Sequence, residues 1–416
     1  MPKRPTDHPA DRASARNSSP IRRPALSVLP PSPDAPTALL GNLTPSQFMR
    51  RYWQKKPLLI RQAIPDIEPP LSREQFFELA DQDEVEARLI THFRNKWQLQ
   101  DGPFAPDELP SVKQRAWTLL VQGVDLHDDR ARALLDRFRF VPDARLDDLM
   151  ISYATDGGGV GPHFDSYDVF LLQVKGKRRW RISAQKDLTL QAGLPLKVLQ
   201  SFAPEQEWLL EPGDMLYLPP HIAHDGIAEG ECMTCSIGFR APSASELTAQ
   251  FLYHLAERGE TARKRGGLYR DPQQAAVKRP AELPGALVEK VGAILAGINW
   301  NERDIASFLG TYLSEPKPNV VFDPPSRPLN EARFIDVASK SGLRLDRKTS
   351  LLYDRRFFFL NGEEMRLEGA KKWLFDLADQ RSMSAKRFVT LWHDSSVTAR
   401  LHEWYCAGWI QVGELA

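Results

Sequence analysis

Cysteine is scarce in this chain of 416 residues, and so are long apolar runs and an excess of charge of one sign. The three cysteines, Cys232, Cys235 and Cys406, are too few for a disulfide framework and fit a reducing cytoplasm. Lys and Arg number 55 against 54 for Asp and Glu, so the overall charge does not indicate a nucleic-acid-binding protein. No apolar run approaches the length of a membrane span, and the N-terminus lacks the apolar core of a secretion signal. We therefore expect a cytoplasmic protein with no membrane association.

Two short motifs lack the partners that their best-known functions need. The glycines at 157–159 are not followed by the Gly-Lys-Ser/Thr of a phosphate-binding loop. Cys232 and Cys235 form a CxxC without a second pair, and on a strand two thiols at this spacing point to opposite faces. We interpret the glycines as residues that let the backbone pass close beside a site, and the cysteines as core residues.

The chemistry is concentrated between residues 157 and 240. His163 and Asp165 are two residues apart, so on an extended strand both side chains project from the same face. An imidazole beside a carboxylate is two thirds of the 2-His-1-carboxylate set that binds one face of Fe(II). A third ligand should come from a strand that folds back beside the first, and the apolar run at 213–219 predicts such a strand.

Two histidines, His221 and His224, follow the Pro219-Pro220 turn that ends this strand. The spacing from Gly213 resembles the second metal motif of cupin barrels, and it selects His224. His221 occupies the turn position where cupins commonly have glycine, so we interpret it as a surface residue.

A basic segment, Lys-Arg-Arg-Trp-Arg-Ile, supplies a candidate for anion binding. Strand alternation puts Arg178 on the same face as Trp180 and Ile182, which belong inside a barrel. A buried guanidinium needs an anionic partner, and its planar fork matches a carboxylate. An oxygenase that uses 2-oxoglutarate must hold the distal carboxylate of that molecule in this way. Arg240 is the competing candidate, but a proline two residues later suggests a position at the exit of a strand.

The blocks GGGVGPHFDSYDVF, GKRRWRI, EPGDMLYLPP and SIGFRAP resemble, in this order, those of the JmjC-type 2-oxoglutarate oxygenases, and most closely the bacterial ribosomal oxygenases. The resemblance is densest over 150–245 and looser over 36–416. The bacterial ribosomal oxygenases hydroxylate an arginine at carbon 3 in the sixteenth large-subunit ribosomal protein. The resemblance implies Fe(II) bound by His163, Asp165 and His224, with 2-oxoglutarate and dioxygen as cosubstrates. It also implies that Ser152 assists Arg178 in binding 2-oxoglutarate, although the backbone is an equally good partner for this hydroxyl.

The fold class that follows is α+β, with a double-stranded β-helix (cupin, or jelly-roll) barrel of the JmjC type. The expected order is a disordered tail at 1–36, N-terminal helices and the barrel at 37–245, a helical dimerisation region at 246–315, a linker at 316–332 and a winged-helix-like module at 333–416. The tail is rich in Pro, Ser, Ala and Arg. The last unit carries Asn361-Gly362, a strong hairpin signal.

The expected partners are a ribosomal protein substrate and a second copy of the chain. The resemblance implies a homodimer, because the family dimerises through helices in the 246–315 region. In the last module acidic residues dilute the positive charge, so we expect no direct DNA binding. A substrate arginine would need acidic residues near the mouth of the barrel. The candidates are Asp156, Asp168, Asp225, Asp214 and Glu229.

Three other functions remain open from the sequence. Relatives with the same barrel hydroxylate histidine in other ribosomal proteins. A metal-dependent cupin isomerase typically has an additional Glu or His in the metal sphere, and the front motif here contains no HxH. A barrel that serves only as a scaffold on the ribosome would tolerate replacement of the three ligands.

Overall fold

The structure is a computed structural model, and it describes residues 30–94, 96–258, 268–366 and 372–413. Most of the tail predicted to be disordered, residues 1–29, lies outside the described residues. None of the described helices is both long and apolar enough to cross a membrane.

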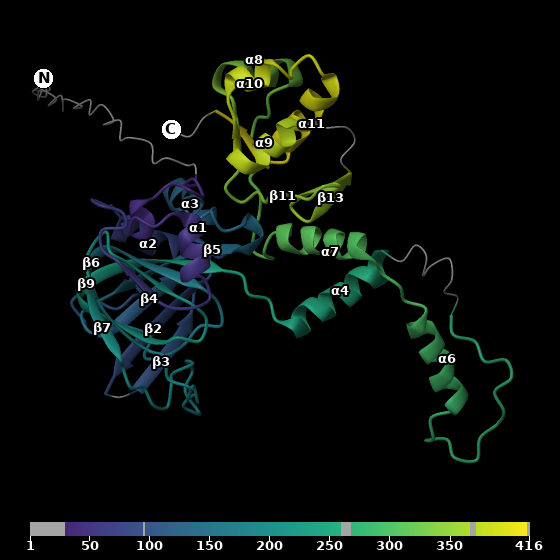
Figure 1. The fold of residues 1–416 in the computed structure, drawn as a ribbon, viewed down its shortest axis with the longest axis horizontal. Coiled ribbons are helices and arrows are strands. Elements are labelled where there is room, and N and C mark those ends of the chain that lie inside the picture. Colours follow the sequence, from purple (N-terminus) through teal and green to yellow (C-terminus); the bar gives the residue numbers. More distant parts are fainter. Residues whose placement is uncertain (1–29, 95, 259–267, 367–371, 414–416) are drawn as a thin grey trace, which may run out of the picture.

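A nine-stranded sheet forms the barrel at the N-terminal end of the chain (Figure 1). Its strands are β1 (Leu58–Ile60), β2 (Ala87–Phe93), β3 (Lys96–Asp101), β4 (Trp117–Val121), β5 (Leu146–Ala154), β6 (Val169–Ser183), β7 (Gln206–Leu210), β8 (Met215–Leu218) and β9 (Ala223–Phe239). The strand order is β1-β8-β6-β9-β5-β4-β2-β3, with β7 paired to β6, and every pairing is antiparallel. This arrangement confirms the predicted jelly-roll class.

Three helices accompany the barrel: α1 (Pro45–Arg51), α2 (Arg73–Leu79) and α3 (Asp129–Asp136). The capping boxes that the sequence predicts at the starts of the first two helices are present, with Thr44 and Ser72 as the N-caps. Phe48 of α1 and Phe76 of α2 are fully buried in the larger core, which lies between the helices and one face of the sheet. A smaller core on the other face includes Trp180.

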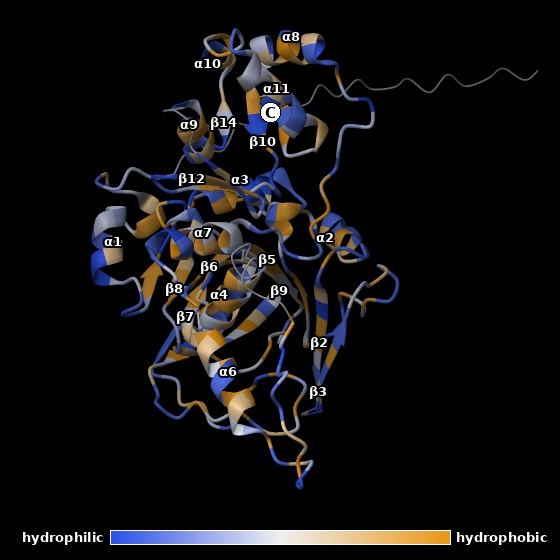
Figure 2. Ribbon diagram, turned by 90° about the vertical axis from the view of Figure 1, so that its right-hand side faces the viewer, coloured by the Kyte–Doolittle hydropathy of each residue, from blue (hydrophilic) through white to orange (hydrophobic). Residues whose placement is uncertain are grey.

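Beyond the barrel come α4 (Ala244–Arg258), α6 (Gly285–Ala296) and α7 (Glu302–Ser314). The helix α6 stands away from the rest of the molecule (Figure 1), and none of its side chains is buried. Apolar residues nevertheless occupy much of its surface (Figure 2). Exposed apolar surface of this kind is typical of interaction sites.

The C-terminal module has its own apolar core. Its elements are α8 (Glu331–Ser341), β10 (Leu343–Leu345), β11 (Leu351–Tyr353), β12 (Phe357–Leu360), β13 (Glu363–Arg366), α9 (Lys372–Gln380), β14 (Ser382–Met383), α10 (Ala385–Val389), α11 (Ser395–Cys406) and β15 (Ile410–Val412). The predicted hairpin joins β12 to β13, with positive φ at Asn361 and Gly362. The helix α7 packs on this hairpin, and a Cβ on its Gly310 would lie 2.2 Å from the ring of Phe359. Thus α7 contacts the C-terminal module although it lies within the region predicted for dimerisation.

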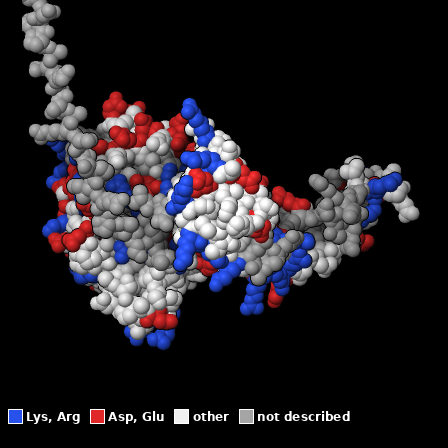
Figure 3. Space-filling view, turned by 90° about the horizontal axis from the view of Figure 1, so that it is seen from above, with Lys and Arg blue, Asp and Glu red and all other residues white. Residues whose placement is uncertain are grey.

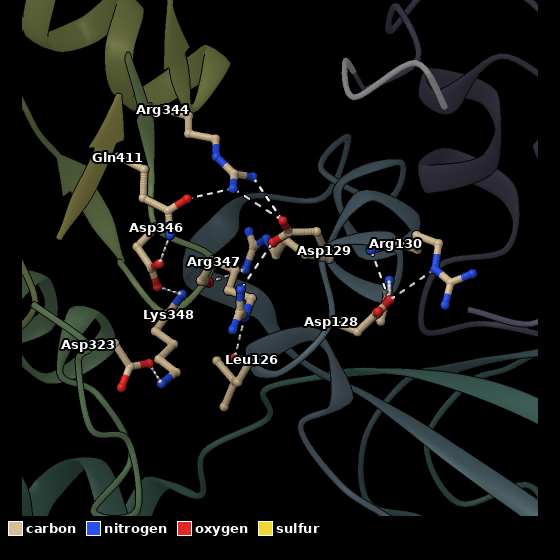
Figure 4. Close-up of polar contacts among 12 residues, drawn as sticks. Leu126, Asp128, Asp129, Arg130, Asp323, Arg344, Asp346, Arg347, Lys348 and Gln411 are labelled. Carbon is tan, nitrogen blue, oxygen red and sulfur yellow. Dashed lines mark hydrogen bonds and ion pairs between the residues drawn. The ribbon is translucent and has the colours of Figure 1, made fainter. Parts of the chain in front are cut away.

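Ion pairs and hydrogen bonds attach this module to α3 and the turn before it (Figure 4). Arg344 contacts the carboxylate of Asp129 at 3.1 Å, and Arg347 contacts the same carboxylate at 3.3 Å and donates to the carbonyl of Leu126 at 2.7 Å. Opposite charges therefore meet where the module contacts α3. Over the face of the molecule shown in Figure 3, basic and acidic side chains are interspersed.

Candidate metal centre

The three predicted ligands lie together at one end of the barrel. One ligand atom from each of His163, Asp165 and His224 lies within 4.8 Å of the others. The two imidazole centroids are 4.2 Å apart, and Nε2 of His224 is 3.6 Å from Oδ2 of Asp165. Across the described ranges, no other set of three or more such side chains comes this close together.

The local structure around His163 differs from the prediction. The expectation that His163 and Asp165 share a strand is wrong, because the chain from Gly161 to the start of β6 forms no strand. His163 instead makes a single bridge to His224, with backbone hydrogen bonds of 2.9 and 2.8 Å. The carbonyl of Asp165 accepts a 2.7 Å hydrogen bond from the backbone of His221. The ligands meet because a loop folds around the start of β9, and strand alternation plays no part.

Backbone carbonyls orient both imidazoles in the same way. Nδ1 of His163 lies 2.8 Å from the carbonyl oxygen of Gly161, and Nδ1 of His224 lies 2.9 Å from that of Ile222. A carbonyl can only accept, so each Nδ1 carries the hydrogen and each Nε2 keeps its lone pair for a metal. Burial, together with the neighbouring His163, lowers the pKa of His224 to about 4, so this imidazole is neutral at neutral pH. A neutral imidazole is the form that binds a metal ion.

His221 lies outside the cluster of ligands. It is exposed, and its φ of 65° is one that glycine adopts readily. This geometry agrees with the interpretation of His221 as a turn residue.

Arg178, the arginine predicted to hold the distal carboxylate of 2-oxoglutarate and called the clamp below, lies further along β6. Arg178 is only 5% exposed, and its Nη1 donates to Oγ of Ser152 on β5 at 3.0 Å. Its Nε and Nη2 atoms, which form one edge of the guanidinium, are buried and have no hydrogen-bond partner in the part of the chain that the structure describes. Two parallel N–H groups on one edge match the two oxygens of a carboxylate. The hydroxyl of Ser152 also lies 3.5 Å from the carbonyl of Thr234, so Ser152 contacts both Arg178 and the backbone.

Trp180 lies between the clamp and the ligands, and its place at the site was not predicted. Its ring centroid is 5.9 Å from that of His224 and 5.8 Å from the guanidinium carbon of Arg178. It faces Gly226 across the strand pair, where a Cβ would lie 2.6 Å from the ring. The alternation that places Arg178 inside the barrel is also the signal that places Trp180 there.

The remaining candidates are occupied by other contacts. Arg240 follows the last residue of β9, and its side chain donates to the carbonyl of Leu313 at 2.7 Å. The acidic candidates all have basic or polar partners: Asp156 with Arg115, Asp168 with Tyr217 and Gln54, Asp214 with Arg61, Asp225 with Arg181, and Glu229 with Arg179. Among these five carboxylates, those of Asp156 and Glu229 are the most exposed, at 44% and 39%. Cys232 and Cys235 are buried in different clusters, as expected for core residues.

A double-stranded β-helix with two imidazoles and a carboxylate at one end, and a buried arginine with a free edge further in, defines the class of 2-oxoglutarate oxygenases. Comparison with known proteins agrees. A family profile described as the JmjC domain matches residues 133–247, and one described as a ROXA-like winged helix matches residues 297–411.

The chain belongs to the ribosomal oxygenase family within the JmjC proteins. It is 32% identical over 358 residues to the ribosomal protein uL16 3-hydroxylase of Escherichia coli, covering 85% of this chain and 94% of that protein. It is 37% identical over 211 residues to a probable ribosomal oxygenase of Haemophilus influenzae, covering 50% of this chain and 52% of that protein. The structure of the E. coli ribosomal oxygenase YcfD in complex with cobalt and 2-oxoglutarate is similar, with a TM-score of 0.73, 31% identity, and coverage of 89% of this chain and 98% of that one.

Proposed function

We propose that this protein is an Fe(II)- and 2-oxoglutarate-dependent oxygenase that hydroxylates carbon 3 of an arginine in ribosomal protein uL16. One observation carries the reaction class. The guanidinium of Arg178 is buried, and one of its edges has no hydrogen-bond partner among the described residues. Arg178 belongs to the β6–β9 strand pair, which also supplies the metal ligand His224. A structural arginine at this depth needs an acidic partner, whereas a cosubstrate carboxylate explains the free edge of Arg178. The choice of substrate rests on similarity to the uL16 3-hydroxylase.

Each part of the site has a separate task. His163, Asp165 and His224 hold the metal on one face and leave its other positions open. When bound, iron would supply the oxidising chemistry, in which dioxygen and 2-oxoglutarate are consumed, one oxygen atom enters succinate as carbon dioxide is released, and the other oxygen atom enters the substrate. Arg178 fixes the direction in which the keto acid lies. The wall formed by Trp180 and its apolar neighbours keeps water away from the reacting atoms.

We infer that two copies of the chain pair through α4 and α6. Apolar side chains on α6 are widely exposed, including Val288 at 60%, Ile294 at 61% and Leu295 at 60%. A second copy would cover this surface, in agreement with the homodimer that the sequence resemblance implies. Replacement of Ile294 by Glu should give a monomer in sedimentation experiments, and a dimer in that variant would contradict the inference.

The place of action would be the cytoplasm, and the partner a ribosomal protein. The winged-helix module, docked on α3, would act in packing or in recognition of a protein rather than in binding DNA.

The reaction is tested by anaerobic reconstitution with Fe(II), followed by measurement of succinate after oxygen is admitted. The arms are a uL16 peptide with its arginine, the same peptide with lysine in its place, and peptides with histidine from other ribosomal proteins. We expect succinate formation and a mass gain of one oxygen with the arginine peptide alone. Hydroxylation of a histidine peptide would favour the histidyl hydroxylase. Metal binding without consumption of 2-oxoglutarate would favour a cupin isomerase or a scaffold.

A further inference from the structure

The loop that carries His163 has little secondary structure of its own and depends on its neighbours. Its single bridge, to His224, leaves the preceding residues without strand pairing. The carbonyl of Gly161 is nevertheless important, because it accepts the hydrogen bond from Nδ1 of His163 at 2.8 Å. Whatever fixes this carbonyl also fixes the imidazole and the direction of its Nε2 lone pair.

Two side chains from distant parts of the chain close over Gly161. This glycine is buried with a φ of +79°, and a Cβ placed on it would lie 3.0 Å from Cζ2 of Trp97 and 3.2 Å from Cγ2 of Val198. Beside it, the backbone of Leu199 donates to the carbonyl of Pro162 at 2.7 Å. The loop that carries His163 is thus held between the β2–β3 hairpin and the 189–199 loop.

Trp97 is itself braced. It belongs to β3, which lies at the edge of the sheet and pairs only with β2 among the described strands. His92 stands directly opposite on β2, and the two rings are stacked with centroids 4.0 Å apart and planes 9° apart. Such stacking stabilises a cross-strand pair. It also limits rotation of the indole away from Gly161.

We propose that Trp97 is a positioning residue for the metal centre, and that His92 supports it. The indole holds the backbone at Gly161, the Gly161 carbonyl holds Nδ1 of His163, and Nε2 of His163 then points at the metal. This role rests on the proposed function, because it requires that His163 binds a metal. Trp97 acts through Gly161 and touches neither metal nor substrate in this account.

The test is the affinity for Co(II) alone, with no cosubstrate or peptide. Partners in the outer shell of a metal site typically contribute 10- to 100-fold to affinity. Trp97 acts one contact further away, so we expect Trp97→Ala to weaken Co(II) binding by about 10-fold, at the lower end of this range. Trp97→Phe, which keeps an aromatic ring over Gly161, should restore most of the affinity. His92→Ala should fall between these two variants.

A second readout separates positioning from general loss of stability. In the Co(II) protein the Nδ1 proton of His163 has a paramagnetically shifted resonance, and its exchange with solvent reports how firmly the Gly161 carbonyl holds it. We expect faster exchange in Trp97→Ala, at temperatures where circular dichroism shows an intact fold. The matched control is Phe93→Ala, since Phe93 is on the same hairpin but is 68% exposed.

The outcomes are distinct. Wild-type affinity and exchange in Trp97→Ala would overturn the positioning role and leave the proposed function intact. Equal weakening in Phe93→Ala would also overturn it, because the effect would then belong to the hairpin as a whole. Absence of Co(II) binding by the wild-type protein would overturn both.

Discussion

Replacement of Arg178 by methionine should stabilise the metal-free protein and, at the same time, prevent its use of 2-oxoglutarate. Two buried N–H groups of Arg178 have no partner among the described residues, and each such group costs roughly 1 to 3 kcal/mol. The substitution removes this cost together with a buried charge, and it loses the single hydrogen bond to Ser152. The expected net gain is about 2 kcal/mol in the free energy of unfolding. Methionine is unbranched and can follow the path of the arginine stem.

The loss of cosubstrate binding should be large. Two charge-assisted hydrogen bonds contribute roughly 3 to 6 kcal/mol, which corresponds to an affinity for 2-oxoglutarate that is weaker by about 10² to 10⁴-fold. Urea denaturation of the metal-free protein measures the first effect. The same denaturation with Co(II), in the presence and absence of 2-oxoglutarate, measures the second. A ligand at 100 times its Kd stabilises by about 2.7 kcal/mol, so the wild type should shift and Arg178→Met should not at the same concentration.

Arg240→Met is the matched control. It removes a hydrogen bond to the carbonyl of Leu313, so it should lower stability slightly and leave the shift with 2-oxoglutarate unchanged. A loss of several kcal/mol in metal-free Arg178→Met would refute the reasoning, because it would mean that the arginine is a structural residue. A normal shift with 2-oxoglutarate in that variant would refute the clamp.

Three further predictions concern the metal, the docked module and pH. His224→Ala should abolish Co(II) binding in equilibrium dialysis, whereas His221→Ala should bind as the wild type does; the opposite pattern would reverse the ligand assignment. Asp129→Ala should remove the ion pairs that dock the C-terminal module, lower stability by about 1 kcal/mol and reduce its dependence on salt; an unchanged salt dependence would show that apolar contacts hold the module. Burial raises the pKa of Asp148 from 3.8 to about 7, so the folded state holds this proton more tightly than the unfolded state. The contribution of Asp148 to stability should therefore be full below its unfolded pKa and be lost as pH rises towards 7, by up to about 4 kcal/mol. The difference in stability between the wild type and Asp148→Asn in denaturation curves from pH 4 to 8 should follow this loss.

Much of the candidate site could be predicted because its residues obey short-range rules. The turn after Pro219-Pro220 delivers His224 to the start of a strand, and strand alternation delivers Arg178 inward beside Trp180. Both rules depend on neighbours within a few positions in the sequence.

Other features depend on structure that a local pattern does not contain. On β6, Phe170 and Leu172 face the core shared with the helices, while Trp180 and Ile182, at positions of the same parity, face the inside of the barrel. Register shifts between Gln173 and Lys177 exchange the two faces. Alternation counted from the first half of the strand would have placed Arg178 on the wrong face. The contact of Trp97 with Gly161 joins distant segments, and nothing in the spacing of either residue predicts it.

The two halves of the site therefore differ in how they are held. Arg178 and His224 belong to β6 and β9, whose register is regular from Lys177↔Glu229 to Ser183↔Ala223. His224 pairs with Ile182, four residues from Arg178, which is roughly 13 Å along the strand, and this separation is fixed by the ladder of hydrogen bonds. His163 has one bridge and relies on packing over Gly161. Loss of the Trp97 ring should consequently weaken metal binding while the clamp keeps its geometry, so that Trp97→Ala and Arg178→Met affect different ligands.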